Sequence, residues 1–219
     1  MNFKFRLVGV SPLLPHADDV DRADQLEEWR KAPENKNKSR AGDDRTPAWT
    51  WLTYTYTDGH VLTIPSDNLM VALRGAGANL ILKKQKTFKA LTQSGLVIKQ
   101  EHMPLLVNGE VIRSEVVNNI ANASDVFSDH AKGVQALGFR LFVKRAKIGQ
   151  SKHIRVRARF DEWAINGEIE TRTDDIAEEH VHKLFEIAGR DYGLCDWRPS
   201  APKAPGPFGR FTCEIVKAA

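Results

Sequence analysis

LTIPSDNLMVALRGAG, residues 62–77, decides the fold more directly than any other stretch of the chain. A β-rich run passes through Ile64 and Pro65, and Ser66 is placed to cap the first turn of a helix. Its apolar stripe at helical spacing consists of Leu69, Leu73, Ala76 and Leu80. A second stripe is almost bare of side chains and consists of Ala72, Gly75, Ala76 and Asn79. This pattern predicts a helix approached closely by its own sheet, by a neighbouring subunit or by nucleic acid.

Strand patterns surround this helix. The chain begins with alternating Phe3, Phe5 and Leu7 and ends with FTCEIVK, residues 211–217. The other predicted strands are 95–100, 104–112 with a turn at Asn108-Gly109, a hairpin over 50–64 turning at Asp58-Gly59, and a strand pair over 137–147 and 153–165. A second helix is predicted from a capping box at Asp175 and Glu178 to Gly189. The order predicts an α+β fold, with an RRM-like or ferredoxin-like antiparallel sheet and helices on one face.

Two long segments depart from this pattern. Residues 15–47 are acidic and then rich in Lys, Asn, Gly and Asp, with one possible amphipathic helix over 24–31. Residues 114–136 are polar and show no strong period. We therefore expect one domain over 1–219 that carries two long insertions, at 15–47 and 114–136.

Composition narrows the class of protein. The 219 residues are 42% hydrophobic and 27% charged, which is ordinary for a globular chain that buries a core. No apolar run approaches the ~20 residues that a membrane helix needs, so we expect a cytoplasmic protein without a membrane partner. Cys195 and Cys213 lie far apart and have no metal-ligating neighbours, which favours two small buried residues. We expect no cofactor and no metal.

Positive charge is concentrated in one segment. Between residues 140 and 159 there are eight basic residues and no acidic one: Arg140, Lys144, Arg145, Lys147, Lys152, Arg155, Arg157 and Arg159. Arg155, Arg157 and Arg159 alternate with apolar residues, and on a strand they recur about 7 Å apart, a spacing that suits successive phosphates of a single strand. The alternative is a solvated face paired with Asp161, Glu162 or the acidic insertion.

Other cations extend this candidate nucleic-acid-binding set. Arg74 follows Leu73 and could contact a phosphate or pair with a carboxylate. Further candidates are Lys83, Lys84, Lys86, His153 and Arg210, the last of these in the glycine loop GPFGR. Alternating aromatics could stack on bases or fill a hairpin face; they are Trp49, Trp51, Tyr54 and Tyr56.

Three motifs together resemble the RAMP superfamily of CRISPR-associated proteins. In the opening stretch the matching residues are Ile64, Pro65, Ser66, Leu69, Ala72, Leu73 and Arg74. FRLVGVSPLLPH, residues 5–16, is similar to that superfamily's first strand, and GPFGRF, residues 206–211, to the glycine-rich loop before its last strand. The resemblance is closest to the subunits that form the backbone of RNA-guided complexes. It implies an RRM-like core, with residues 15–47 as a finger-like and 114–136 as a thumb-like insertion.

The resemblance implies a non-enzymatic protein that assembles along single-stranded RNA such as a guide RNA, with further copies of itself and other subunits of an RNA-guided complex, in antiviral defence. Two alternatives remain open. One is a metal-independent endoribonuclease of RAMP type, with His16 or His153 as general base. The other is a phage or mobile-element relative that binds single-stranded nucleic acid or imitates a backbone subunit.

Overall fold

The computed structural model describes residues 1–38, 42–81, 87–148 and 151–218, and it has an α+β architecture consistent with a ferredoxin-like arrangement. The chain forms two compact units. The first comprises residues 1–14, 63–111 and 161–219, and the second comprises 15–62 and 112–160. Both segments that we expected to be insertions, 15–47 and 114–136, belong to the second unit. Their correspondence to a finger and a thumb stays a prediction.

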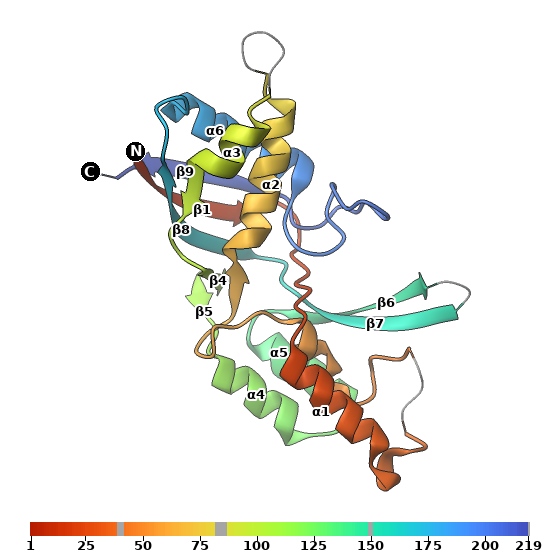
Figure 1. Ribbon diagram of the computed structural model, residues 1–219. Helices are drawn as coiled ribbons and strands as arrows, with labels where there is room; N and C mark the ends of the chain where they lie inside the picture. The colour runs from red at the N-terminus through yellow and green to blue at the C-terminus, as the bar shows by residue number, and fades with distance from the viewer. Residues whose placement is uncertain (39–41, 82–86, 149–150, 219) are drawn as a thin grey trace. The chain divides into compact units, whose positions relative to one another are not determined.

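An antiparallel sheet forms the centre of the first unit (Figure 1). Its main order is β2 (Thr63–Pro65), β4 (His102–Val107), β8 (Trp163–Thr171), β1 (Asn2–Gly9) and β9 (Phe211–Lys217). Two short strands, β3 (Leu96–Ile98) and β5 (Glu110–Val111), pair with β8 and β4. The alternation in β1 behaves as predicted, because Phe3, Phe5 and Leu7 are buried whereas Lys4 is exposed. The predicted turn at Asn108-Gly109 is confirmed, since both residues have positive φ.

Helices cover the face of this sheet to which Phe5 belongs. They are α2 (Ser66–Asn79), α3 (Lys89–Gly95) and α6 (Glu178–Ile187), and a π-helical turn, η4 (Ala188–Tyr192), continues α6. The rings of Phe5 and Phe185 lie 5.2 Å apart and join β1 to α6. No described helix is both long and apolar enough to cross a membrane.

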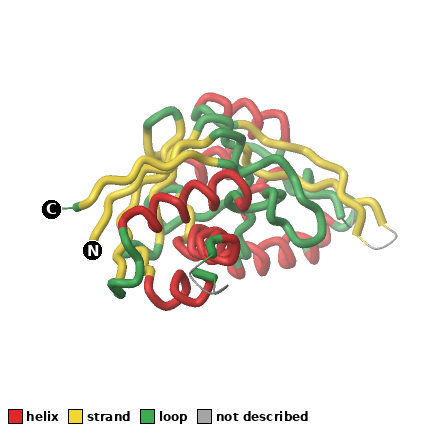
Figure 2. The backbone as a smooth tube through the Cα atoms, turned by 90° about the horizontal axis from the view of Figure 1, so that it is seen from above, coloured by secondary structure: helices red, strands yellow, loops and turns green. Residues whose placement is uncertain are grey.

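The second unit contains helices and a two-stranded ribbon. Its elements are α1 (Val20–Lys31), η1 (Pro33–Asn35), η2 (Ala48–Tyr54), α4 (Ser114–Ala123), α5 (Phe127–Ala136), β6 (Arg140–Ile148) and β7 (Ser151–Arg159). Trp51 is fully buried, and its indole N–H donates to Nδ1 of buried His130. Phe139 packs between Trp51 and Phe160, with ring centres 6.1 and 4.8 Å away. Figure 2 shows β6 and β7 running side by side as one hairpin.

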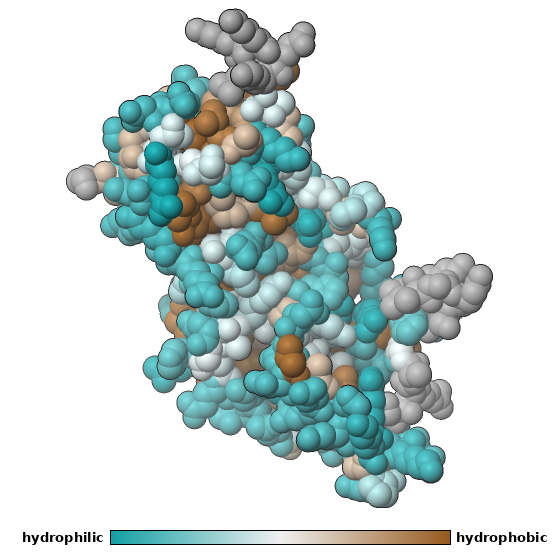
Figure 3. All heavy atoms as spheres, viewed as in Figure 1, coloured by the Kyte–Doolittle hydropathy of each residue, from teal (hydrophilic) through white to brown (hydrophobic). Residues whose placement is uncertain are grey.

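Several local predictions were wrong. The first arm of the hairpin predicted over 50–64 is the 3-10 helix η2, although a turn with positive φ at Gly59 does form. Residues 114–136, for which the sequence indicated no strong period, form α4 and α5. The helix predicted over 24–31 begins earlier, at Val20. None of its residues is buried, so it has no apolar face packed against the protein. Figure 3 shows hydrophilic side chains over most of the surface where α1 lies.

The predicted helix boundaries also need correction. Ser66 does not cap α2; it is the first helical residue, and its N–H donates to the Glu101 carbonyl. Helix α6 starts after Ala177, whose N–H donates to the ring of His180, so Asp175 is no capping residue. Contrary to the prediction, Gly189 does not end the helix but lies inside η4, and the helical segment ends at Gly193, which has φ 69°. Gly189 is needed for another reason, because a Cβ there would lie 2.1 Å from the Phe211 carbonyl oxygen.

Candidate nucleic-acid interface

The β6–β7 hairpin gathers basic side chains on one face. Its register places Arg140 opposite Arg159, Phe142 opposite Arg157 and Lys144 opposite Arg155. Residues directly opposite each other in an antiparallel pair project to the same side, and so do alternate residues along a strand. One face therefore carries five basic residues, which we call the basic face: Arg140, Lys144, Arg155, Arg157 and Arg159.

A segment of the acidic insertion runs along β7 and supplies a carboxylate to this face. The N–H of Ile154 donates to the Gly42 carbonyl at 2.7 Å, and the N–H of Asp44 donates to the Ile154 carbonyl at 2.9 Å. These bonds extend the ribbon by a short parallel bridge, and they place the Asp44 side chain beside β7. Asp44 is 4% exposed, so its carboxylate is almost fully withdrawn from water.

Asp44 is held by four groups. Arg155 Nη1 donates at 3.2 Å, the Tyr54 hydroxyl at 3.2 Å and the Val156 N–H at 3.4 Å, while Arg157 Nη1 lies 3.7 Å away. A buried carboxylate requires such neighbours, because an uncompensated buried charge costs several kcal/mol, about 3 to 5 when one partner of a buried pair is removed. The pairing with the acidic insertion, the alternative left open from the sequence, is therefore realised at Asp44.

Arg157 serves as a structural element of this face. Its side chain is only 7% exposed, its Nη1 donates to the Val156 carbonyl, and its guanidinium carbon lies 3.5 Å from the centre of the Tyr54 ring. The sequence predicted Arg157 as one of three successive phosphate contacts, with a solvated face as the alternative; the structure covers Arg157 with Tyr54 and Asp44, so at this position the face is not solvated. Arg157 thus positions Tyr54 and Asp44.

The other cations of the basic face are more accessible. Arg140 is exposed, and Lys144, Arg155 and Arg159 are half-buried. The Arg159 guanidinium lies over the Phe142 ring, 5.5 Å from its centre. A guanidinium group at this distance from a ring makes a cation–π contact. The basic face therefore combines cations and two aromatic rings, those of Tyr54 and Phe142.

The structure places the remaining predicted residues elsewhere. Arg145 is exposed, but it is opposite Ile154 and so belongs to the other face of the hairpin. His153 belongs to the face of Arg155 and contacts Gly42. For Lys147 and Lys152, which pair with each other, the structure describes only the strand backbone. Lys83, Lys84 and Lys86 lie outside the described residues.

Arg74 and Arg210 both belong to the first unit. Arg74 is half-buried on α2, next to buried Leu73. Arg210 is exposed, and its Nε donates to the Arg190 carbonyl at 3.2 Å. The glycine loop before it packs on the protein itself, since a Cβ on Gly209 would lie 2.0 Å from the Leu194 carbonyl oxygen.

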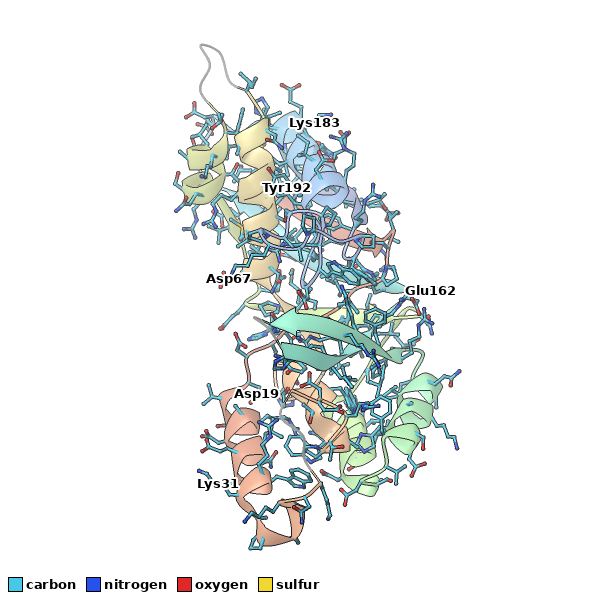
Figure 4. All side chains as sticks on the ribbon, turned by 90° about the vertical axis from the view of Figure 1, so that its right-hand side faces the viewer. Asp19, Lys31, Asp67, Glu162, Lys183 and Tyr192 are labelled. Carbon is cyan, nitrogen blue, oxygen red and sulfur yellow. The ribbon has the colours of Figure 1, made fainter. Side chains whose placement is uncertain are left out.

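The bare stripe of α2 also packs inside the protein. A Cβ on Gly75 would lie 2.2 Å from Cε1 of Tyr192, and Figure 4 shows Tyr192 against α2. A Cβ on Gly77 would lie 2.4 Å from the Thr92 hydroxyl oxygen, which belongs to α3. The sequence left three partners open for this stripe, and at Gly75 the structure gives a different one, η4 of the same chain; Gly77, next to the stripe, contacts α3.

Several residues at the interface were not singled out from the sequence as parts of it. Asp44 carried no local signal, whereas the alternation of Phe142 with Arg140 and Lys144 could have indicated their common face. Tyr54 had been weighed as a base-stacking residue, but its role under Arg157 depends on contacts across about a hundred positions of the chain.

Metal and thiol chemistry find little support in the described part of the chain. There, no group of three or more His, Cys, Asp or Glu side chains is arranged to hold a metal ion. Cys195 is buried and Cys213 half-buried, and burial raises the pKa of both thiols. A raised pKa leaves little thiolate at neutral pH, so neither cysteine is an activated nucleophile.

The fold and this face define an α+β protein with a basic, aromatic-lined β-ribbon. No family model matches the chain, and no curated protein matches it.

Proposed function

We propose that the protein binds single-stranded RNA along the basic face and assembles on it with further copies of itself, as a backbone-type subunit of an RNA-guided complex. The observation that carries the proposal is the grouping of Arg140, Lys144 and Arg159 around the Phe142 ring on one face of an extended ribbon. Cations neutralise phosphates without regard to sequence, and rings stack on any base. Low sequence specificity follows, as a subunit that grips many guide sequences requires.

The support for this function has two parts. The α+β sheet is the kind of core that the RAMP resemblance implies, and the acidic insertion contributes Asp44, which organises the basic face. Arg155 and Asp44 hold Tyr54 through its hydroxyl group, with the Arg155 contact at 3.1 Å. Because Tyr54 is held in place, it fixes the position of the Arg157 guanidinium group that packs on its ring.

The experiment is to purify the protein and to measure the ultraviolet absorbance ratio of the preparation, with nuclease treatment of whatever co-purifies. RNA of one defined length, sensitive to ribonuclease and resistant to deoxyribonuclease, is the expected result. DNA or mixed cellular RNA would restrict the function to general single-strand binding. A preparation that is free of nucleic acid, and that binds none when it is added, would favour a protein that imitates a backbone subunit.

A second candidate function is a metal-independent endoribonuclease, and one contact favours it. The exposed imidazole of His16 packs edge-on against Tyr54, with ring centres 5.5 Å apart, next to the arginines that surround Asp44. An imidazole beside fixed cations is a suitable general base for attack by a ribose hydroxyl group. Cleavage of labelled RNA in EDTA that disappears in His16→Ala, with binding retained, would establish this function; intact RNA would leave binding alone.

A further inference from the structure

The first unit has one protected and one unprotected sheet edge. On one side, β2 is three residues long and contains Pro65, and both features discourage pairing with another chain. On the other side, β9 is a seven-residue strand, FTCEIVK, that contains neither proline nor glycine. A long edge strand of β-forming residues recruits further strands unless something covers it. The β9 edge is therefore the one of the two that can pair with a further strand.

The hydrogen bonds of β9 show which of its backbone groups face outward. Val10 donates to the Arg210 carbonyl and Ala218 donates to the Asn2 carbonyl, each at 2.8 Å, and both bonds fit the register of β1 with β9. In an antiparallel ladder the bonded positions alternate, so the even-numbered residues of β9 bond to β1. The backbone N–H and C=O groups of Cys213, Ile215 and Lys217 therefore point away from the sheet, and among the described residues they have no backbone partner.

One end of this edge is closed and the rest is open. The Phe211 carbonyl is covered by Gly189 of η4, as the short distance to a Cβ at Gly189 indicates. Beyond this point a pocket of about 390 Å³ opens beside Cys213. Its lining comes from α6, from η4 and from β9 with the turn before it, and includes His182, Glu186, Arg190, Arg210, Phe211 and Cys213. An edge strand with a pocket between it and a flanking helix is the geometry that accepts an added peptide strand.

Charge identifies the kind of peptide. Within the described structure Glu186 is bound by Lys183 and Arg190, and Asp191 is bound by Arg190, so these carboxylates are already neutralised. The exposed Arg210 uses its Nε on the Arg190 carbonyl and forms no ion pair within 4.0 Å among the described residues, while its charge contributes to lowering the pKa of Asp191. Its remaining N–H donors are available to a carboxylate, while Phe211 and Cys213 offer an apolar floor.

We propose that the edge of β9 binds an extended segment of another protein, which adds a strand next to Cys213, Ile215 and Lys217, inserts one apolar side chain into the pocket and places a carboxylate on Arg210. Main-chain hydrogen bonds supply affinity, whereas the pocket and Arg210 supply specificity. This site belongs to the first unit and involves no residue of the basic face. Peptide binding can therefore be tested independently of RNA binding.

The test uses a phage-displayed library of random heptapeptides, selected on the full-length protein, followed by fluorescence anisotropy with one synthetic selected peptide. We expect the selected sequences to share an apolar residue at a fixed distance from Asp or Glu. Lys217→Pro removes an outward N–H without removing a bond to β1, and Arg210→Glu reverses the charge at the rim. Each should weaken peptide binding at least tenfold. Glu214→Gln, on a residue whose backbone faces β1, is the matched control and should change it less than twofold.

Three results would overturn the proposal. The first is a library that yields no shared sequence, and the second is a selected peptide whose affinity is unchanged in Lys217→Pro and Arg210→Glu. The third is self-association of the wild-type protein in analytical ultracentrifugation that Lys217→Pro abolishes, because the edge would then be occupied by a second copy. Arg140→Glu should leave peptide binding intact, and this variant separates a failure here from a failure of the RNA-binding proposal.

Discussion

The guanidinium carbon of Arg157 lies 3.5 Å from the centre of the Tyr54 ring, and both side chains meet the carboxylate of Asp44. This relationship connects a strand of the hairpin to the end of η2 and to the acidic insertion. It explains why Arg157 is buried although it belongs to a basic strand. The same contacts hold Arg155 in place, since Arg155 also donates to Asp44.

Asp44→Asn should lower the free energy of unfolding by about 3 kcal/mol, because it leaves Arg155 and Arg157 without their carboxylate partner. Urea denaturation followed by circular dichroism measures the change. Glu27→Gln is the control, since Glu27 pairs with Lys31 on the exposed helix α1 and its loss should cost less than about 1 kcal/mol. Equal effects at the two positions would show that Asp44 does not organise this face.

The pair of Trp51 and His130 gives a second prediction. The Trp51 N–H donates to Nδ1 of His130, and the opposite ring nitrogen lies 2.7 Å from the Ser124 carbonyl, so a neutral ring with its proton on Nε2 satisfies both contacts. His130→Ala leaves a buried donor and a cavity, and should cost about 2 to 4 kcal/mol. His182→Ala, on the exposed side of α6, should have little effect on the same thermal or urea measurement.

Gly75→Ala tests the packing of α2. The new methyl group collides with Tyr192, so stability should fall by about 1 to 3 kcal/mol while RNA affinity stays unchanged. The double variant Gly75→Ala, Tyr192→Leu should recover part of the loss, because a smaller side chain at residue 192 relieves the collision. Reduced RNA affinity in a folded Gly75→Ala protein would instead mean that the bare stripe contacts nucleic acid.

Local pattern predicted much of the first unit and the β6–β7 strand pair of the second, whereas η2, α4 and α5 were not predicted. Alternation in β1 and the turn at Asn108-Gly109 are local signals, and both are confirmed. The β-forming run around Trp51 becomes a 3-10 helix because its side chains pack on His130 and Phe139, contacts that override local preference. In α4 and α5 the buried residues do follow helical spacing, Val117 with Ala121 and His130 with Val134, so a local signal for these helices was present and was missed.

The candidate site shows the same division. Alternation predicted that Arg155, Arg157 and Arg159 share one face of a strand, and the hairpin register agrees. The carboxylate of Asp44, which binds Arg155 and Arg157, lies 111 positions before Arg155, and no spacing in the sequence indicates such a partner. The burial of Arg157 followed from that partner, and so it could not be predicted either.

Asp58 makes one turn sensitive to pH. The backbone N–H groups of Val61 and His60 donate to its carboxylate at 2.8 Å and hold its pKa below the ordinary value. A lowered folded pKa means that the charged form adds stability above the unfolded pKa of about 3.9, and that this stability is lost as the pH falls through the folded pKa. The stability difference between wild type and Asp58→Asn should therefore shrink between about pH 6 and pH 3, as measured by urea denaturation. A constant difference would show that these bonds do not favour the charged form.

The central claim, that the basic face binds single-stranded RNA, is tested most directly by the salt dependence of affinity. Fluorescence anisotropy with a labelled single-stranded RNA should give a logarithmic affinity that falls linearly with the logarithm of salt concentration, by roughly 0.7 per phosphate neutralised. Arg140→Ala, Lys144→Ala and Arg159→Ala, combined in one folded protein, should weaken binding and flatten that slope by about 2, whereas Arg30→Ala on exposed α1 should change neither. An unchanged affinity and slope in the triple variant would contradict the account.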